Sequence, residues 1–137
     1  MMRADFQRLA ELRLSEAEAL LRAGLWAGAY YLAGYAVEHA LKACIAKRTR
    51  AEEYPPRNTK ESHYVHDVKK LVVTADLESE LKAKRADTAF ADNWKVVTDW
   101  NEHARYEDTW TQAEAEALLK AIADPINGVV TWIRAHW

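Results

Sequence analysis

Hydrophobic positions recur every three or four residues along most of the chain, which is the period of amphipathic helices. Residues 3–23 carry an apolar side and a charged side, and Gly24 follows as a helix-ending residue. Residues 25–50 carry two apolar stripes rather than one, so the helix predicted there must be covered from more than one side. Its glycines and alanines allow close approach of neighbouring backbones. We therefore expect either the central helix of a bundle or half of a subunit interface.

Beyond residue 50 the pattern of breakers and capping signals predicts shorter elements. Pro55 and Pro56 close the second helix, and a polar loop runs to about residue 64. A short helix is expected over 66–74, followed by a longer one that Asp76 caps and that ends near residue 102. Phe90, Trp94, Val97 and Ala104 lie on one side of this longer helix.

The last helix has the clearest start signal, since Thr111 and Glu114 have the spacing of a capping box. Residues 124–128 contain a proline and a glycine, so we expect a kink or two short helices there. Short connections favour antiparallel neighbours. The sequence thus predicts an all-α fold: an up-and-down bundle of four main helices plus the short one at 66–74.

Composition and charge limit the number of domains and the kinds of ligand that the chain can bind. With 137 residues, half of them hydrophobic, the chain fits one domain spanning 1–137 with a sizeable core. Lys and Arg number 19 against 21 Asp and Glu. Such a balance excludes nucleic-acid binding through bulk positive charge, so any phosphate contact must be local.

Cysteine usage and hydropathy indicate a cytoplasmic protein. The single cysteine, Cys44, excludes an internal disulfide framework, and the first residues are too charged for a signal peptide. No apolar run approaches the roughly 20 residues of a membrane span. His63, His66 and Asp67 have a spacing that can hold zinc, but without a third fixed ligand a loop and helix-cap role is favoured, and we predict neither metal nor cofactor.

Three stretches together resemble the HEPN domain, a helical bundle associated with nucleotide binding. They are AEALLRAGLWAGAYYLAGYAVEHALKACIAK (17–47), SHYVHDVKKL (62–71) and NWKVVTDWNEHARYE (93–107). The order of the three stretches carries the resemblance more than any one of them does. It covers most of the chain.

This resemblance implies several functions. Many HEPN proteins are metal-independent endoribonucleases of toxin–antitoxin, antiphage or RNA-processing systems, and others are non-catalytic partners of small nucleotidyltransferases. Several form homodimers. The ribonucleases carry an Arg followed, roughly four to six residues later, by a His near the end of the fourth helix. Here His103 precedes Arg105, so the order is absent, and the one matching spacing, Arg57 to His63, falls in the loop before the third helix.

A rearranged site remains open from the chemistry of the residues. Metal-free RNA cleavage needs a base for the 2′-hydroxyl and a cation for the phosphate, roles that suit His and Arg. On a continuous helix, Asp99 would orient His103, while Arg105 and Tyr106 would contact a phosphate. The structural alternative is a surface pair of Asp99 with His103, with Arg105 bridging to a nearby carboxylate and Tyr106 packing over a helix end.

Glu38 stands in the middle of the most apolar helix and needs a partner, because an unpaired buried carboxylate is costly. The ordinary partner is Lys42, four residues on. The alternative is Arg105, which the bundle would bring from the end of the fourth helix. We adopt the second as our prediction. His39, beside it, is expected to be a structural helix histidine.

Two functional hypotheses follow. The favoured one is a non-catalytic HEPN module, a homodimer that binds RNA, a nucleotide or a partner protein such as a nucleotidyltransferase. The alternative is a metal-independent endoribonuclease with Glu38, Asp99, His103, Arg105 and Tyr106 in its site. Trp110 and Trp137 are the tryptophans that we single out for partner contact.

Overall fold

A computed structural model describes residues 1–49, 52, 54 and 66–137 of the chain. Within that part the elements are all helical, which confirms the all-α prediction. They are α1 (Arg3–Arg22), α2 (Trp26–Lys47), α3 (Val68–Thr74), α4 (Glu78–Lys84), α5 (Thr88–Thr98), the 3-10 helix η2 (Glu102–Tyr106), α6 (Gln112–Ala123) and α7 (Val129–Arg134).

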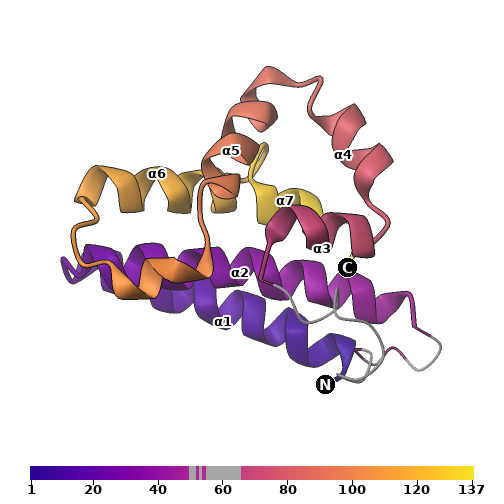
Figure 1. The fold of residues 1–137 in the computed structure, drawn as a ribbon, viewed down its shortest axis with the longest axis horizontal. Coiled ribbons are helices and arrows are strands. Elements are labelled where there is room, and N and C mark those ends of the chain that lie inside the picture. Colours follow the sequence, from indigo (N-terminus) through magenta and orange to yellow (C-terminus); the bar gives the residue numbers. More distant parts are fainter. Residues whose placement is uncertain (50–51, 53, 55–65) are drawn as a thin grey trace.

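The two longest helices, α1 and α2, lie side by side and antiparallel along the long axis of the molecule (Figure 1). Gly24 makes the turn between them with a φ of +80°, a conformation that favours glycine. Helix α1 buries Phe6, Ala10, Leu14 and Ala17. Helix α2 buries six alanines of its own, and such small residues let neighbouring helix backbones pack closely.

Helix α2 is the centre of the bundle. Besides α1 it contacts α3, α6, α7 and η2, and both of its predicted stripes contribute buried residues. This confirms the first of the two alternatives for this helix. Its apolar sides are covered within the chain, so they no longer argue for a subunit interface.

The predicted helix from Asp76 to residue 102 is wrong in its extent, because the chain forms α4, α5 and η2 there. Asp76 does not begin a helix: with a φ of +58° it ends α3, where its N–H donates to the Val73 carbonyl and that of Leu77 donates to Val72. The aspartate that does cap a helix in this stretch is Asp87, at the start of α5. Its Oδ1 accepts hydrogen bonds from the N–H groups of Ala89 and Phe90.

The local start and stop signals further along are confirmed. Thr111 Oγ1 accepts from the Glu114 N–H at 3.2 Å, and Glu114 Oε1 accepts from the Thr111 N–H at 3.1 Å. The chain breaks between α6 and α7 as expected. At Gly128 a Cβ would lie 2.5 Å from the Asp124 carbonyl oxygen, so the turn leaves no room for a side chain.

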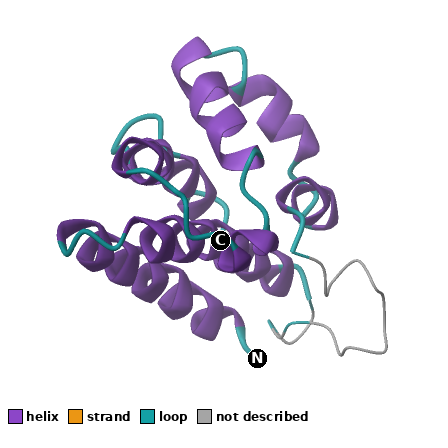
Figure 2. Ribbon diagram, turned by 60° about the vertical axis from the view of Figure 1, so that its left-hand side comes forward, coloured by secondary structure: helices purple, strands orange, loops and turns teal. Residues whose placement is uncertain are grey.

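The helices form successive layers, with α1 at one edge, α2 next, α6 and α7 above them, and the α4–α5 pair farthest from α1 (Figures 1 and 2). Trp110 and Trp137 are partly buried and pack against the core. Trp110 stacks on Tyr30 with 3.8 Å between ring centroids. No helix in the described ranges is both long and apolar enough to cross a membrane.

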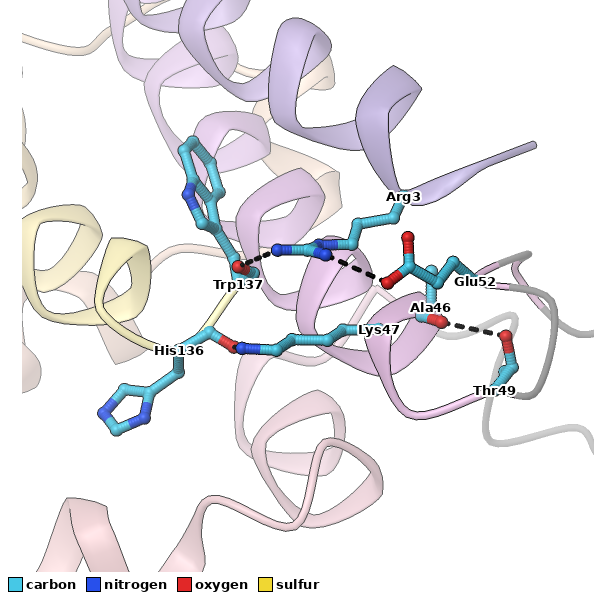
Figure 3. Close-up of polar contacts among 7 residues, drawn as sticks. All are labelled: Arg3, Ala46, Lys47, Thr49, Glu52, His136 and Trp137. Atoms are coloured by element: carbon cyan, nitrogen blue, oxygen red, sulfur yellow. Dashed lines mark hydrogen bonds and ion pairs between the residues drawn. The ribbon is translucent and has the colours of Figure 1, made fainter.

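His136 and Trp137 accept hydrogen bonds from side chains at the start of α1 and the end of α2 (Figure 3). The Arg3 guanidinium donates to the Trp137 carbonyl at 2.7 Å and to Glu52 Oε1 at 3.1 Å, and Lys47 donates to the His136 carbonyl at 3.5 Å. Nearby, Cys44 is buried with its Sγ 3.9 Å from the Ile133 carbonyl oxygen. Burial raises the pKa of this thiol to about 12.

Candidate functional site

A groove of about 580 Å³ separates the start of α3 from the end of α5 and the start of η2. Its first wall is formed by residues 66–70 and its second by Thr98 and residues 100–103. We call it the α3–η2 groove. Both walls rest on α2, which contacts α3 and η2. The central helix thus sets the spacing between the walls.

Glu38 of α2 is the one buried charged residue in the described part of the chain, with 1% of its surface exposed. Its Oε1 accepts a hydrogen bond from Lys42 Nζ at 2.8 Å and lies 2.7 Å from Nδ1 of His66. Its other oxygen, Oε2, has no hydrogen-bond partner among the described residues. Glu38 therefore connects the interior of α2 to His66, which lines the groove.

The ordinary partner of Glu38, Lys42, is present, and the predicted partner, Arg105, forms no ion pair with it in the described structure. Arg105 lies instead over the ring of Tyr106, 4.7 Å from its centroid, in the exposed helix η2. A hydrogen bond to Tyr106 is the main cause that raises the pKa of the Arg105 guanidinium. The pairing prediction was wrong because His66, far away in sequence, occupies the place assigned to Arg105.

Asp99 and His103 do not lie on one continuous helix, so the argument from their spacing does not hold. Helix α5 ends at Thr98, and Asp99 is its C-cap residue. Asn101 then starts η2 by accepting a hydrogen bond from the His103 N–H at 2.9 Å. The His103 imidazole is 74% exposed and lies 3.9 Å from a Glu102 oxygen.

Of the predicted site residues, His103 lines the groove, and Glu38 reaches it through His66. Asp99, Arg105 and Tyr106 are not among the groove-lining residues. Tyr106 has 72% of its surface exposed, and its ring is covered on one side by the Arg105 guanidinium. The structure thus divides the predicted set between a groove wall, the core and an exposed turn.

Trp100 gives the second wall its apolar base and was not predicted as a site residue. It is buried, and Tyr35 meets it edge to face with 5.1 Å between centroids. Tyr35 also lies 6.2 Å from His66 in a T-shaped arrangement. Burial is the main cause that raises the pKa of the Tyr35 hydroxyl, so this ring is a neutral packing element between the two walls.

His39 packs in the core as a structural histidine, but it is not the satisfied helix histidine that the sequence predicted. Its ring packs between Phe6 and Tyr35, with centroid distances of 6.1 and 6.0 Å. Burial lowers the pKa of its imidazole to about 4, so this histidine is neutral at pH 7. Its Nδ1 is buried, with no hydrogen-bond partner in the part of the chain that the structure describes.

Sequence reasoning missed His66, Lys69 and Lys70 as groove residues, although it singled out the His66–Asp67 pair. Asp67 is the helix cap expected from that pair, because its Oδ1 accepts from the N–H groups of Lys69 and Lys70 at 2.9 and 3.2 Å. No metal-binding group of three or more His, Cys, Asp or Glu residues occurs in the part of the chain with described structure. Arg57 and His63 lie outside the described residues.

A comparison with models of known protein families identifies the family of this chain, which its geometry alone does not. The family model for the HEPN domain matches residues 4–127. Comparisons with curated proteins and with solved structures gave no match. Because the family match extends over nearly the whole chain, and the helical fold agrees with it, this protein belongs to the HEPN domain family.

Proposed function

We propose that this protein is a non-catalytic HEPN module that binds RNA or a nucleotide in the α3–η2 groove. The observation that carries the proposal is the pair of exposed lysines, Lys69 and Lys70, on the first wall. Neither ammonium has an ion-pair partner among the described residues. Free ammonium groups in a groove are suited to phosphate oxygens.

The other charges of the groove leave these lysines available. Asp67 also lines the groove, but one of its carboxylate oxygens is already occupied by the two backbone N–H groups that it caps. Glu102 lies on the opposite wall beside His103. A volume of about 580 Å³ is within the range of small-molecule sites and accommodates a nucleotide.

The absence of catalysis is proposed from the placement of the predicted acid, base and cation. Metal-free cleavage requires a base and a cation that reach the same phosphate. Asp99 caps a helix end, His103 lies on the groove wall, and Arg105 lies on Tyr106. This arrangement agrees with the missing Arg-to-His order in the sequence.

Binding can be measured by fluorescence anisotropy with a labelled single-stranded RNA at several salt concentrations. We expect wild-type binding to weaken with salt, and the double variant Lys69→Ala/Lys70→Ala to bind less tightly with a salt slope smaller by about 1.4, the value for two lost phosphate contacts. The control is Lys82→Ala/Lys120→Ala, which removes two exposed lysines outside the groove. Equal affinities for all three proteins would overturn the proposal.

The same protein tests the alternative of a metal-independent endoribonuclease. RNA incubated with the wild type in the presence of a chelator should remain intact. Cleavage that persists with the chelator and disappears in His103→Ala and Arg105→Ala would establish the rearranged catalytic site and end the non-catalytic proposal.

Homodimerisation, and a nucleotidyltransferase partner within a toxin–antitoxin or defence-type system, are proposed from the family resemblance alone. The apolar sides of α2 give no support to a dimer, since other elements of the same chain cover them. Light scattering at micromolar concentration tests the dimer, and a monomeric mass would contradict it.

A further inference from the structure

We propose that His66 accepts a hydrogen bond from a ribose hydroxyl in the α3–η2 groove and thereby makes the groove prefer RNA over DNA. This inference rests on the proposed function, because it assigns a ligand group to a residue of the same groove. It names a specificity-determining residue. The argument depends on how Glu38 and Lys42 hold the imidazole.

The first step concerns the proton on the inner nitrogen of His66. Glu38 is paired with Lys42, whose Nζ lies 2.8 Å from Oε1 and whose side chain is only 12% exposed. The Lys42 ammonium can only donate, so Oε1 is the acceptor in this contact. Since Nδ1 of His66 lies 2.7 Å from the same oxygen, Nδ1 must be the donor.

The second step concerns the net charge around the carboxylate. Lys42 already supplies one positive charge for Glu38, so His66 does not have to be protonated to make its contact. A neutral imidazole that carries its proton on Nδ1 has a free electron pair on Nε2. Glu38 thus selects the tautomer in which Nε2 is an acceptor.

The third step is the direction of that acceptor. Nδ1 and Nε2 lie on different edges of the ring, so a ring whose Nδ1 faces buried Glu38 presents Nε2 away from the core. The His66 side chain is 44% exposed and lines the groove. The edge-to-face contact with Tyr35 restricts rotation of the ring. Nε2 is therefore available to a ligand in the groove.

The fourth step identifies the ligand group. An acceptor nitrogen needs a donor, and phosphate oxygens provide none at neutral pH. Lys69 and Lys70 follow His66 closely on the same wall, where the proposed function places a phosphate. In RNA the hydroxyl nearest a backbone phosphate is the ribose 2′-OH, which DNA lacks and through which proteins distinguish the two.

The test compares three single strands of one sequence: RNA, DNA and 2′-O-methyl RNA, which keeps the oxygen but loses its proton. We expect the wild type to bind RNA about three- to tenfold more tightly than the other two, the range for one net hydrogen bond. In His66→Phe, which keeps an aromatic ring against Tyr35, the three affinities should become equal while the DNA affinity stays unchanged. His136→Phe is the matched control: it lies outside the groove, keeps an aromatic ring against Trp132, and should keep the RNA preference.

Several outcomes overturn the inference and separate it from the proposed function. If RNA and DNA bind wild type equally and Lys69→Ala/Lys70→Ala weakens both, the groove binds phosphate but His66 does not read ribose. If His66→Phe keeps the RNA preference, another residue reads the hydroxyl. If no strand binds, the proposed function fails together with this inference. Nitrogen NMR of the free protein adds a check, since a proton on Nε2 of His66 at neutral pH also contradicts the proposal.

Discussion

Gly34 of α2 lies directly against the indole of Trp100. A Cβ built at Gly34 would be 2.0 Å from Trp100 Cε2 and 2.3 Å from Nε1, so the two residues can be neighbours only because position 34 has no side chain. The contact brings the chain after α5 onto the central helix. It thereby sets the second wall of the α3–η2 groove.

Replacement of Gly34 by alanine should destabilise the protein, because a buried indole ring must move. Overpacking of this kind costs about 1–3 kcal/mol or more. Urea unfolding followed by circular dichroism measures the loss. Gly28→Ala is the matched control on the same helix: its Cβ would lie 3.3 Å from Leu20 Cδ1, the end of a side chain that can adjust, and alanine should gain up to about 1 kcal/mol in helix propensity. Equal stabilities for the two variants would contradict the packing described here.

Substitutions at Asp76 and Asp87 should differ in their effect on stability, with a loss expected only at Asp87. Asp87 caps α5 through two backbone N–H groups, and Asp87→Ala should cost about 1 kcal/mol. Asp76 has a φ of +58°, so Asp76→Gly relieves a conformation that favours glycine. Asp76→Gly also removes an exposed ion pair with Arg48, which contributes little to stability. We therefore expect the free energy of unfolding to stay unchanged or to rise by up to about 1 kcal/mol. A large loss at Asp76 would show that this residue begins the next helix.

Removal of the Glu38 carboxylate should be costly. Glu38→Ala leaves the largely buried ammonium of Lys42 without its partner and removes the contact to His66, and we expect a loss of about 3–5 kcal/mol in the free energy of unfolding. Glu11→Ala provides the comparison, since Glu11 and Arg134 form a two-bond ion pair on the surface that should contribute about 1 kcal/mol or less. Similar losses in the two variants would mean that Glu38 is not the buried centre of its network.

The stability of the protein should decrease as the pH falls from about 6.5 toward 4. The pKa of His39 is lowered from 6.5 to about 4 in the folded protein, so within this window the unfolded chain binds more protons and stability rises with pH. The full shift corresponds to at most ~3 kcal/mol, reduced by partial solvent access. His39→Gln should reduce this part of the pH dependence. Proton NMR would contradict the prediction if the His39 ring titrates near pH 6.5.

Local signals in the sequence were sufficient to predict the helix ends whose hydrogen-bond partners lie within one helical turn. The capping box of Thr111 and Glu114 needs only residues three apart, and the break at Gly128 follows from a proline and a glycine close together. The same kind of signal misled at Asp76, while Asp87 was not recognised as a cap from the sequence. Both precede helical stretches, and only the left-handed backbone at Asp76 shows that it ends one helix rather than beginning another.

The site was less predictable because its contacts join distant segments. The partner of Glu38 within α2 follows from a helical spacing, whereas His66 is 28 residues away and depends on how α3 packs on α2. The expected pair of Asp99 and His103 assumed that the helix continues. Trp100 interrupts it by packing on Gly34, and no local pattern marks that contact.

The buried thiol of Cys44 offers a natural reporter for motion between α2 and α7. It lies against the Ile133 carbonyl, and its raised pKa keeps it protonated at neutral pH. Because Cys44 is buried, a thiol-specific reagent can modify it only in molecules in which the packing around it has briefly opened, as when α7 detaches from α2. The labelling rate of the native protein would then report how often this part of the core opens, with no engineered probe.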